Sequence, residues 1–357
     1  MKLTVKETRV ICSNPDNPYN GYFAWPTVTR LRDGRLAMVA SGFRRRHVCP
    51  FGKVVICYSR DEGKTWTRPA IIMDTPLDDR DAGILPFGEN GIMVTSFNNT
   101  KASQAAWNGH GDGWNKQGDP YIDGYLEVLD GEAAEAKYLG STFILSGDGG
   151  TTFGEVKRIP ISSPHGPTLM PDGSILYVGR YFTAQSDNWL AAYKVYPDGT
   201  YELLGEIPEI APDLYSCEPH AVVLKNGKIL VHIREDRHFT TYQSESVDGG
   251  RTFTKPHQIL EDRGGAPAHL LVLRDGTLIS VYGYREAPFG IKVMASRDGG
   301  ETWDTGHDLF VSGIHPDLGY PASVELENED VLTVFYARPS VEAPAVILQT
   351  IWHLDEI

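Results

Sequence analysis

A short turn motif occurs four times along this chain, and its spacing limits the possible folds more than any other feature. Each copy reads Ser-x-Asp-x-Gly-x-Thr followed by an aromatic residue, and the copies lie at Ser59–Trp66, Ser146–Phe153, Ser246–Phe253 and Ser296–Trp303. The Asp can bond to nearby backbone and the Gly accepts a positive φ, so the motif predicts a tight hairpin turn anchored by the aromatic ring. The last three copies begin 100 and 50 residues apart. A period of about 50 residues is typical of propeller blades.

A second repeat indicates the same period. Each of its six units combines an apolar run, a turn and a further apolar strand, which together predict a β-hairpin. The first runs and their turns occupy residues 26–34, 81–91, 165–173, 219–227, 268–276 and 321–328. Six such units predict an all-β fold, a six-bladed β-propeller with about four strands in each blade. The terminal β-like runs, 2–11 and 345–352, are predicted to close the ring together in blade six.

Length and composition are consistent with one large β domain. The chain has 357 residues, of which 41% are hydrophobic, so it can bury a sizeable core. We therefore expect a single propeller domain over residues 1–357. The period is broken by an insertion at 98–138, which is rich in Gly, Asn and Asp and carries Trp107 and Trp114. It is predicted to be a long loop of blade two, and loops of that length are often functional.

Charge and cysteine content exclude several classes of partner. A net charge of −14 argues against nucleic acid and against anionic membranes, although a local cluster of Arg can still hold a small anion. No apolar stretch of 18 residues and no signal peptide is present. Four cysteines without metal-ligand or redox spacing favour reduced thiols in the cytoplasm, and secretion stays open if a leader has been removed. We predict no cofactor and no metal, and the sequence leaves the oligomeric state open.

The geometry of a propeller indicates where its chemistry would lie. The residues at the heads of the innermost strands converge at one mouth of the central channel, and a second set of polar residues lies at the far ends of the same strands or in the loops just after them. Buried charges are costly unless paired, so polar residues repeated at these positions predict a polar pocket. The candidates at the heads are Trp25, Asp79, Arg80, Asp81, His165, Glu218, His220, His269 and Tyr320, and those at the far ends are Arg44, Arg46, His47, Arg180, Arg234 and Arg285.

With its Asp-box turns and six-blade period, the chain resembles the sialidase (neuraminidase) superfamily of glycoside hydrolases over nearly its whole length. Three segments carry the more specific likeness. The segment 216–234 is similar to the one in which a Glu precedes two strands ending in an Arg of the substrate-binding triad, 281–285 to the strand of another triad Arg, and 318–324 to the segment of the nucleophilic Tyr. The resemblance implies Glu218 as base, Tyr320 as nucleophile, and Arg234 and Arg285 as ligands of a substrate carboxylate.

Two departures from the family pattern affect the site. Sialidases carry Arg-Ile-Pro at the head of blade one, whereas residues 24–26 read Ala-Trp-Pro. The segment in which the family carries its acid/base Asp, here residues 44–52, contains no carboxylate. Another guanidinium and another proton donor are therefore needed. The candidates are Arg44 or Arg46 for the former, and His47, Asp79 or Asp81 for the latter.

Taken with its chemistry, the resemblance implies an exo-acting glycoside hydrolase that removes a terminal, acidic, sialic-acid-like sugar. A neutral Tyr suits an anomeric carbon that bears a carboxylate, because an anionic nucleophile would be repelled; a Glu within reach would take its proton. Two alternatives stay open. A polysaccharide lyase could act on uronate glycans with His, Tyr and Arg, and a non-catalytic propeller could bind carbohydrate. The three channel histidines, one in each of three blades, could bind a metal, transfer protons or hydrogen-bond a sugar.

Overall fold

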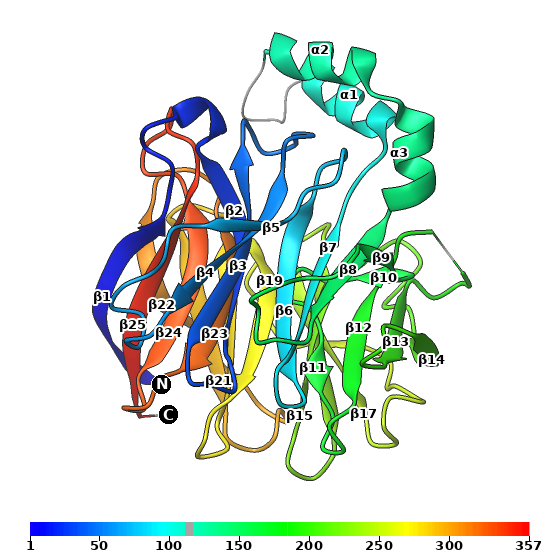
Figure 1. Ribbon diagram of the computed structural model, residues 1–357. Helices are drawn as coiled ribbons and strands as arrows, with labels where there is room; N and C mark the ends of the chain where they lie inside the picture. The colour runs from blue at the N-terminus through cyan, green and yellow to red at the C-terminus, as the bar shows by residue number, and fades with distance from the viewer. Residues whose placement is uncertain (111–116, 184, 357) are drawn as a thin grey trace.

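The computed structural model describes residues 1–357 apart from 111–116, 184 and 357. The described residues form six antiparallel sheets arranged as a ring (Figure 1). This is the predicted all-β, six-bladed propeller. In the part of the chain that the structure describes, helices are all too short or too polar to cross a membrane.

Each blade is one sheet whose strands follow one another outward from the axis. The first two sheets are β2 (Tyr22–Arg30), β3 (Leu36–Arg44), β4 (Lys53–Ser59) and β5 (Ala70–Met73), then β6 (Arg80–Phe87), β7 (Gly91–Phe97), β8 (Ser141–Ser146) and β9 (Lys157–Arg158). The third holds β10 (Ile161–Ser162), β11 (Thr168–Leu169), β12 (Ile175–Tyr181), β13 (Leu190–Val195) and β14 (Tyr201–Ile207). The last three are β15 (Ser216–Val223), β16 (Ile229–Glu235), β17 (Thr240–Ser246) and β18 (His257–Gln258); β19 (Gly265–Val272), β20 (Leu278–Tyr284), β21 (Phe289–Ser296) and β22 (Asp304–Gly313); and β23 (Gly319–Glu325), β24 (Val331–Ala337), β25 (Val346–Glu356) and β1 (Lys2–Cys12).

The sixth blade is built from both ends of the chain. The N-terminal strand β1 pairs with the C-terminal strand β25, which in turn pairs with β24. The two termini therefore lie close together at one end of the propeller (Figure 1). Closure of the ring by the terminal strands is as predicted, and it supplies β25 with partners on both of its sides.

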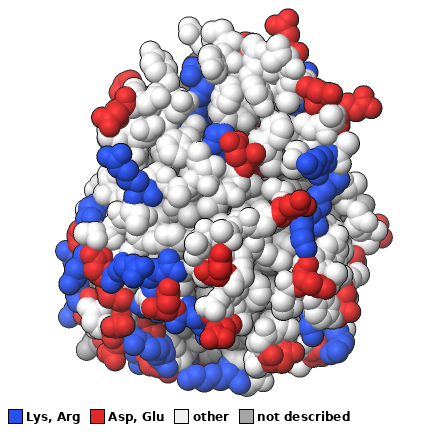
Figure 2. All heavy atoms as spheres, in the orientation of Figure 1, with Lys and Arg blue, Asp and Glu red and all other residues white. Residues whose placement is uncertain are grey.

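The four Asp boxes are turns at the ends of the third strands of their sheets. In the first box Ser59 Oγ donates to Asp61 Oδ1 at 2.8 Å, and the Thr65 backbone N–H donates to the same oxygen at 2.8 Å. The other three boxes repeat these bonds. Because strands alternate in direction, the boxes lie at the end of the propeller opposite the heads of the innermost strands. Figure 2 shows charged side chains concentrated in the half of the molecule away from the helices.

The insertion in the second sheet joins β7 to β8 and is helical rather than the expected long loop. Its described part contains α1 (Lys101–His110), α2 (Pro120–Val128) and α3 (Gly131–Tyr138), which stand at one end of the propeller (Figure 1). Asp119 and Asp130 cap α2 and α3 by accepting bonds from the Tyr121 and Ala133 N–H groups. An Asp before a helix-compatible segment is a helix-start signal, and the prediction of a loop from the composition of this insertion was wrong for its described part. Trp114 lies outside the described residues.

Candidate active site

One backbone feature, repeated in four blades, sets the direction of four side chains near the propeller axis. In five of the innermost strands, two residues near the head stand opposite one residue of the second strand, which is a β-bulge. In four of these strands the first bulged residue has a positive φ, 54° in Trp25, 53° in Asp81, and 48° in Glu218 and Tyr320. A non-glycine residue in this region is strained by about 1–2 kcal/mol, and such strain clusters at functional sites.

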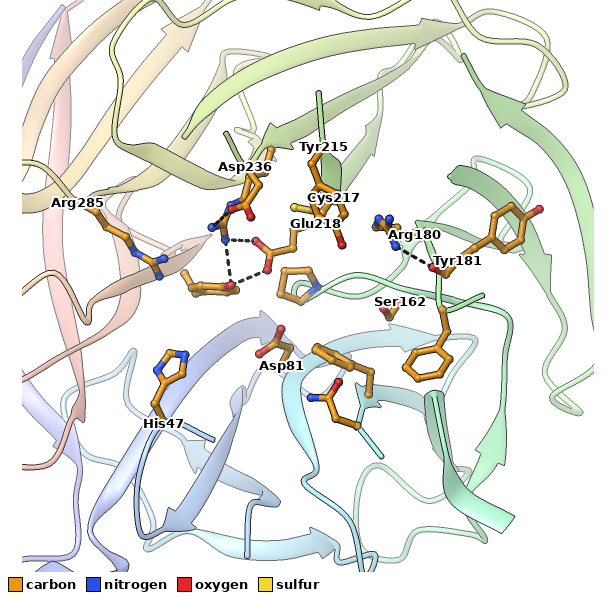
Figure 3. Close-up of a pocket in the computed structure, with 16 residues that line it drawn as sticks. His47, Asp81, Ser162, Arg180, Tyr181, Tyr215, Cys217, Glu218, Asp236 and Arg285 are labelled. Carbon is orange, nitrogen blue, oxygen red and sulfur yellow. Dashed lines mark hydrogen bonds and ion pairs between the residues drawn. The ribbon is translucent and has the colours of Figure 1, made fainter. Parts of the chain in front are cut away.

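The bulged residues help to form a cavity of about 440 Å³ at the mouth of the channel. Asp81, Glu218 and Tyr320 line it, and the Trp25 ring lies beside that of Tyr320, with centroids 6.3 Å apart. Figure 3 shows side chains converging on the cavity from the blades around it. Seven of the residues predicted from the sequence line this cavity, namely His47, Asp81, Arg180, Glu218, Arg234, Arg285 and Tyr320.

Tyr320, Glu218 and Arg234 form a closed hydrogen-bonded triangle. The Tyr320 hydroxyl donates to Glu218 Oε1 at 2.6 Å, and Arg234 Nη1 donates to Glu218 Oε2 at 2.6 Å and to Tyr320 Oη at 3.2 Å. Burial raises the pKa of Tyr320 well above its ordinary value, and the neighbouring Glu218 carboxylate raises it further. The phenol is therefore neutral at rest, and the carboxylate is placed to take its proton. Arg234 also pairs with Asp236.

Two other guanidinium groups of the cavity, Arg285 and Arg180, are held in place without a carboxylate. Arg285 donates from Nε to the Leu318 carbonyl at 3.0 Å and from Nη2 to Tyr336 Oη at 3.3 Å. Arg180 lies against two aromatic rings, with Cζ 4.0 Å from the Trp189 centroid and 4.4 Å from that of Tyr215. In the described structure neither forms an ion pair with a carboxylate. They stand on opposite sides of Glu218 (Figure 3), so the cavity offers positive charge to an anionic ligand.

The Asp81 carboxyl faces the triangle across the cavity (Figure 3). It is 3% exposed, and Oδ1 has no hydrogen-bond partner among the residues described, although Arg80 Nε lies 3.8 Å away. Burial raises the pKa of Asp81 to about 7, with Arg80 opposing the shift and Glu218 adding to it. A carboxyl group that still holds its proton near neutral pH can act as a general acid.

His47 contacts the carboxylate of Asp317, which was not among the predicted site residues. Its Nδ1 lies 3.1 Å from Asp317 Oδ1 and 2.9 Å from Tyr22 Oη, while Tyr22 and Arg338 Nε donate to the same carboxylate. Burial lowers the pKa of His47, and Asp317 partly counteracts this effect. Asp317 precedes β23 by two residues and shows no motif of its own. Only the folded chain brings it beside residues 22, 47 and 338.

Two predicted arginine ligands are bound elsewhere in the protein. Arg44 is fully buried and forms a two-pronged ion pair with Asp78, at 2.6 and 3.0 Å. Arg46 donates to Asn108 Oδ1 of α1 at 2.7 Å and to the Gln117 carbonyl at 2.8 Å. Neither lines the cavity, so the expectation that one replaces the missing blade-one Arg is not supported by the geometry. Their contacts instead hold the 44–52 segment and the helical insertion in place.

Trp25, Arg80 and Asp79 also lie outside the cavity lining. The Trp25 ring has the Arg44 and Arg80 guanidinium carbons 4.7 and 4.3 Å from its centroid and forms part of the support beneath Tyr320. Asp79 is fully buried and accepts bonds from the Thr75 N–H at 2.6 Å and the Thr75 hydroxyl at 2.8 Å. Although burial raises the pKa of Asp79 to about 7, its carboxyl closes a turn and does not face the cavity.

The three predicted histidines meet on the axis as a buried cluster. The His220 and His269 rings stack with centroids 4.4 Å apart, and the His165 ring meets them edge-on at 5.6 and 5.1 Å. Burial lowers the pKa of all three, to about 3 for His220. They do not line the cavity, and among the described residues no set of three or more His, Cys, Asp or Glu side chains is arranged to hold a metal ion.

Several cavity residues were not among the predicted site residues. Cys217 and Tyr215 flank the head of β15, Asp236 follows β16, and the remaining positions come from the blade-two and blade-three edges. A single residue type in the sequence could have indicated where the bulges lie. Three of the four strained residues are followed by Pro, at Pro26, Pro219 and Pro321, a residue that cannot donate a ladder bond and is found at bulges. The remaining lining residues are Phe97, Asn99, Ser162, Pro164, Tyr181 and Phe182.

Together the fold and this site define a six-bladed β-propeller with Asp-box turns and a polar cavity at one mouth of its channel. A family model described as a BNR repeat-like domain matches residues 127–332. The match spans more than half of the chain, which therefore belongs to this family. A search of curated proteins finds no match.

Solved structures with the same fold include proteins of more than one activity. A protein of unknown function from Dyadobacter fermentans is similar with a TM-score of 0.77 and 22% identity, over 99% of both chains. The NanB sialidase of Streptococcus pneumoniae has a TM-score of 0.67 and 15% identity, over 97% of this chain and 70% of that one. The α-L-arabinofuranosidase of Fusarium graminearum has a TM-score of 0.63 and 12% identity, over 97% of each. At these identities the likeness establishes the fold.

Proposed function

We propose that this protein is an exo-acting, retaining glycoside hydrolase that removes a terminal acidic, sialic-acid-like sugar. The observation that carries the proposal is the 2.6 Å hydrogen bond from the Tyr320 hydroxyl to Glu218, inside a cavity that Asp81 also lines. A neutral nucleophile, its base and a separate proton donor are then present together.

In the first step Tyr320 Oη attacks the anomeric carbon while its proton passes to Glu218. The glycosidic carbon–oxygen bond breaks, and the leaving oxygen takes the proton held by Asp81. The products of this step are the released alcohol, a sugar bonded to Tyr320, a protonated Glu218 and an ionised Asp81.

In the second step the ionised Asp81 takes a proton from a water molecule, and the oxygen of that water attacks the anomeric carbon. The bond between the sugar and Tyr320 breaks, and the phenolate recovers its proton from Glu218. Both carboxyl groups return to their starting state. Two displacements at one carbon give net retention of configuration.

An acidic substrate is supported by the charges of the cavity. Arg285 lies beside the nucleophile, with Cζ 5.5 Å from the centroid of the Tyr320 ring. Arg180 and Arg285 have no carboxylate partner within the described structure, whereas Arg234 is already paired with Glu218 and Asp236. An incoming carboxylate would find a preorganised planar donor at Arg285. The alternative lyase would use His165, His220 and His269, which are buried and do not line the cavity.

The proposal is tested by substitution of the two central residues and a panel of substrates. We expect Tyr320→Phe and Glu218→Gln to lower kcat on a chromogenic sialoside by at least about a thousandfold while retaining the fold, because each change removes one protonic group. Tyr282→Phe is the matched control, since Tyr282 is a buried tyrosine of β20 that does not line the cavity. A Tyr320→Phe variant with near wild-type turnover would rule out the tyrosine mechanism. Screening sialosides, other 2-keto acid glycosides, arabinosides and uronate oligosaccharides for reducing ends and for ultraviolet absorbance separates a hydrolase from a lyase.

A further inference from the structure

A second cavity of about 500 Å³ lies beside the first blade, separate in its lining from the candidate active site. It is bounded by the loop that contains the short helix η1 (Pro18–Asn20), by the ends of β3 and β4, and by α2. The loop and α2 lie at the same end of the propeller (Figure 1). The lining residues are Asn14, Asn17, Tyr19, Asn20, Phe43, Arg45, Phe51, Lys53 and Tyr121.

Aromatic rings in this cavity are exposed and yet held in place. Tyr19 and Tyr121 are 73% and 65% exposed, and both line this cavity. The Arg45 guanidinium carbon lies 5.7 Å from the Tyr19 centroid and 4.9 Å from that of Tyr121, and the Phe51 ring packs 5.5 Å from the Tyr121 ring. Both tyrosine rings therefore lie near the same guanidinium.

The charged groups that line this cavity are already neutralised. Arg45 donates to both oxygens of Asp119, at 2.7 and 3.2 Å, and Lys53 pairs with Asp74. Asp119 also accepts the Tyr121 N–H at 2.9 Å, so one carboxylate fixes both the arginine and the start of α2. No net charge remains to attract an ionic ligand. The other polar side chains of the lining carry the two tyrosine hydroxyls and three amides, of which Asn14 Nδ2 donates to the Asn20 carbonyl at 3.2 Å.

The strand that supplies Phe43 is bent at this point. Gly42 and Phe43 stand opposite the single residue Phe23 in the β2–β3 pairing, and Phe43 has a φ of +54°. This bulge holds the Phe43 ring against Phe23, with centroids 5.2 Å apart, at the wall of the cavity. A strained bulge re-aims a side chain and is retained where the surrounding structure requires it.

We propose that this second cavity binds a neutral oligosaccharide. Exposed tyrosine rings offer flat apolar faces to the C–H side of a sugar, and neighbouring amides can exchange hydrogen bonds with its hydroxyl groups. The 44–52 segment carries Arg45 at this cavity and His47 at the candidate active site. The second site thus lies on the other side of that segment. Binding of a glycan at this site is a non-catalytic function that is distinct from the proposed hydrolysis.

Binding is measured by titration calorimetry or by ligand-observed NMR with lactose, cellotriose and arabinotriose. We expect saturable binding of at least one of them to the wild type, and a loss of about tenfold or more in affinity for Tyr19→Ala and for Tyr121→Ala, as for aromatic anchors in general. Tyr201→Ala is the matched control, because Tyr201 is an exposed tyrosine of β14 outside both cavities. It should bind as the wild type does.

Glycan binding is measured without turnover, so failure of this proposal can be distinguished from failure of the proposed function. Turnover of a small chromogenic glycoside, if the wild type shows it, should stay within about twofold in Tyr121→Ala, and circular dichroism checks the fold of each variant. Absence of binding by all three sugars would overturn the proposal. Equal affinity in wild type and Tyr121→Ala would overturn it as well.

Discussion

Replacing Asp81 by Asn should make the protein more stable at alkaline pH while removing its proposed acid. The carboxyl group is buried, and burial raises its pKa from 3.8 to about 7. In the unfolded chain the group ionises near pH 4, whereas in the folded protein it holds its proton until about pH 7. Stability is therefore lost as the pH rises through this window, because the unfolded state then binds fewer protons than the folded state.

The size of the effect follows from the width of that window. The interval between 3.8 and about 7 spans about three pH units, and one unit corresponds to about 1.4 kcal/mol, so the penalty above pH 7 is about 4 kcal/mol. About two of the three units lie between pH 5 and pH 7. The gain in unfolding free energy from Asp81→Asn should thus grow by about 3 kcal/mol between pH 5 and pH 8.

Denaturant unfolding of both proteins at pH 5 and pH 8 measures this difference. Asp79→Asn is the control, since Asp79 is equally buried but accepts two bonds from Thr75 and does not line the cavity. Because burial raises the pKa of Asp79 to about 7 as well, the stability of Asp79→Asn relative to wild type should follow a similar pH trend, but this variant should keep its activity because Asp79 does not line the cavity. In the wild type, kcat/KM should decline above about pH 7 as Asp81 loses its proton, and Asp81→Asn should have little activity. An Asp81→Asn variant whose stability relative to wild type is the same at pH 5 and pH 8 would refute the reasoning.

Two further predictions concern the ends of the propeller. Arg285→Lys should raise KM for a carboxylate-bearing substrate by about tenfold with little change in kcat, because Lys lacks the planar fork; initial-rate kinetics measure this, and an unchanged KM would show that Arg285 does not hold the carboxylate. Asp248→Ala should lower the thermal midpoint without altering KM, because the Asp248 carboxylate accepts bonds from Ser246 and Thr252 in its turn; weakened substrate affinity would contradict a purely structural role for the Asp box.

Much of the architecture follows from local sequence signals. The Asp boxes specify their own turns, because Ser, Asp, Gly and Thr bond within about five residues of one another. Their spacing therefore indicates the length of a blade, and the six hairpin units indicate the number of blades, before any long-range contact is known. The helical insertion was harder to predict, since Asp119 and Asp130 are short polar residues that occur both in loops and as helix caps.

Within the site, the residues predicted by family likeness are brought together, while several others are not. Glu218, Arg234, Arg285 and Tyr320 line one cavity although they come from three blades. Arg44 is also an arginine at the end of a strand, as Arg234 and Arg285 were predicted to be, but it lies buried against Asp78. A strand alternates its side chains between two faces, and a bulge changes that alternation. The direction of each side chain thus depends on the pairing register, which the sequence alone does not show.

The sequence by itself determined the repeat, the number of blades and the turns, and its family resemblance pointed to Glu218 and Tyr320. Only the tertiary structure decided which buried carboxyl group faces the cavity and which of the cavity's arginines have no carboxylate partner among the described residues. Asp79 and Asp81 are two residues apart, yet one closes a turn with Thr75 and the other faces the cavity from a strained bulge. The physical reason is that burial and charge pairing depend on neighbours from other blades, such as Asp317 behind His47. Such neighbours are distant in sequence and meet only when the ring closes.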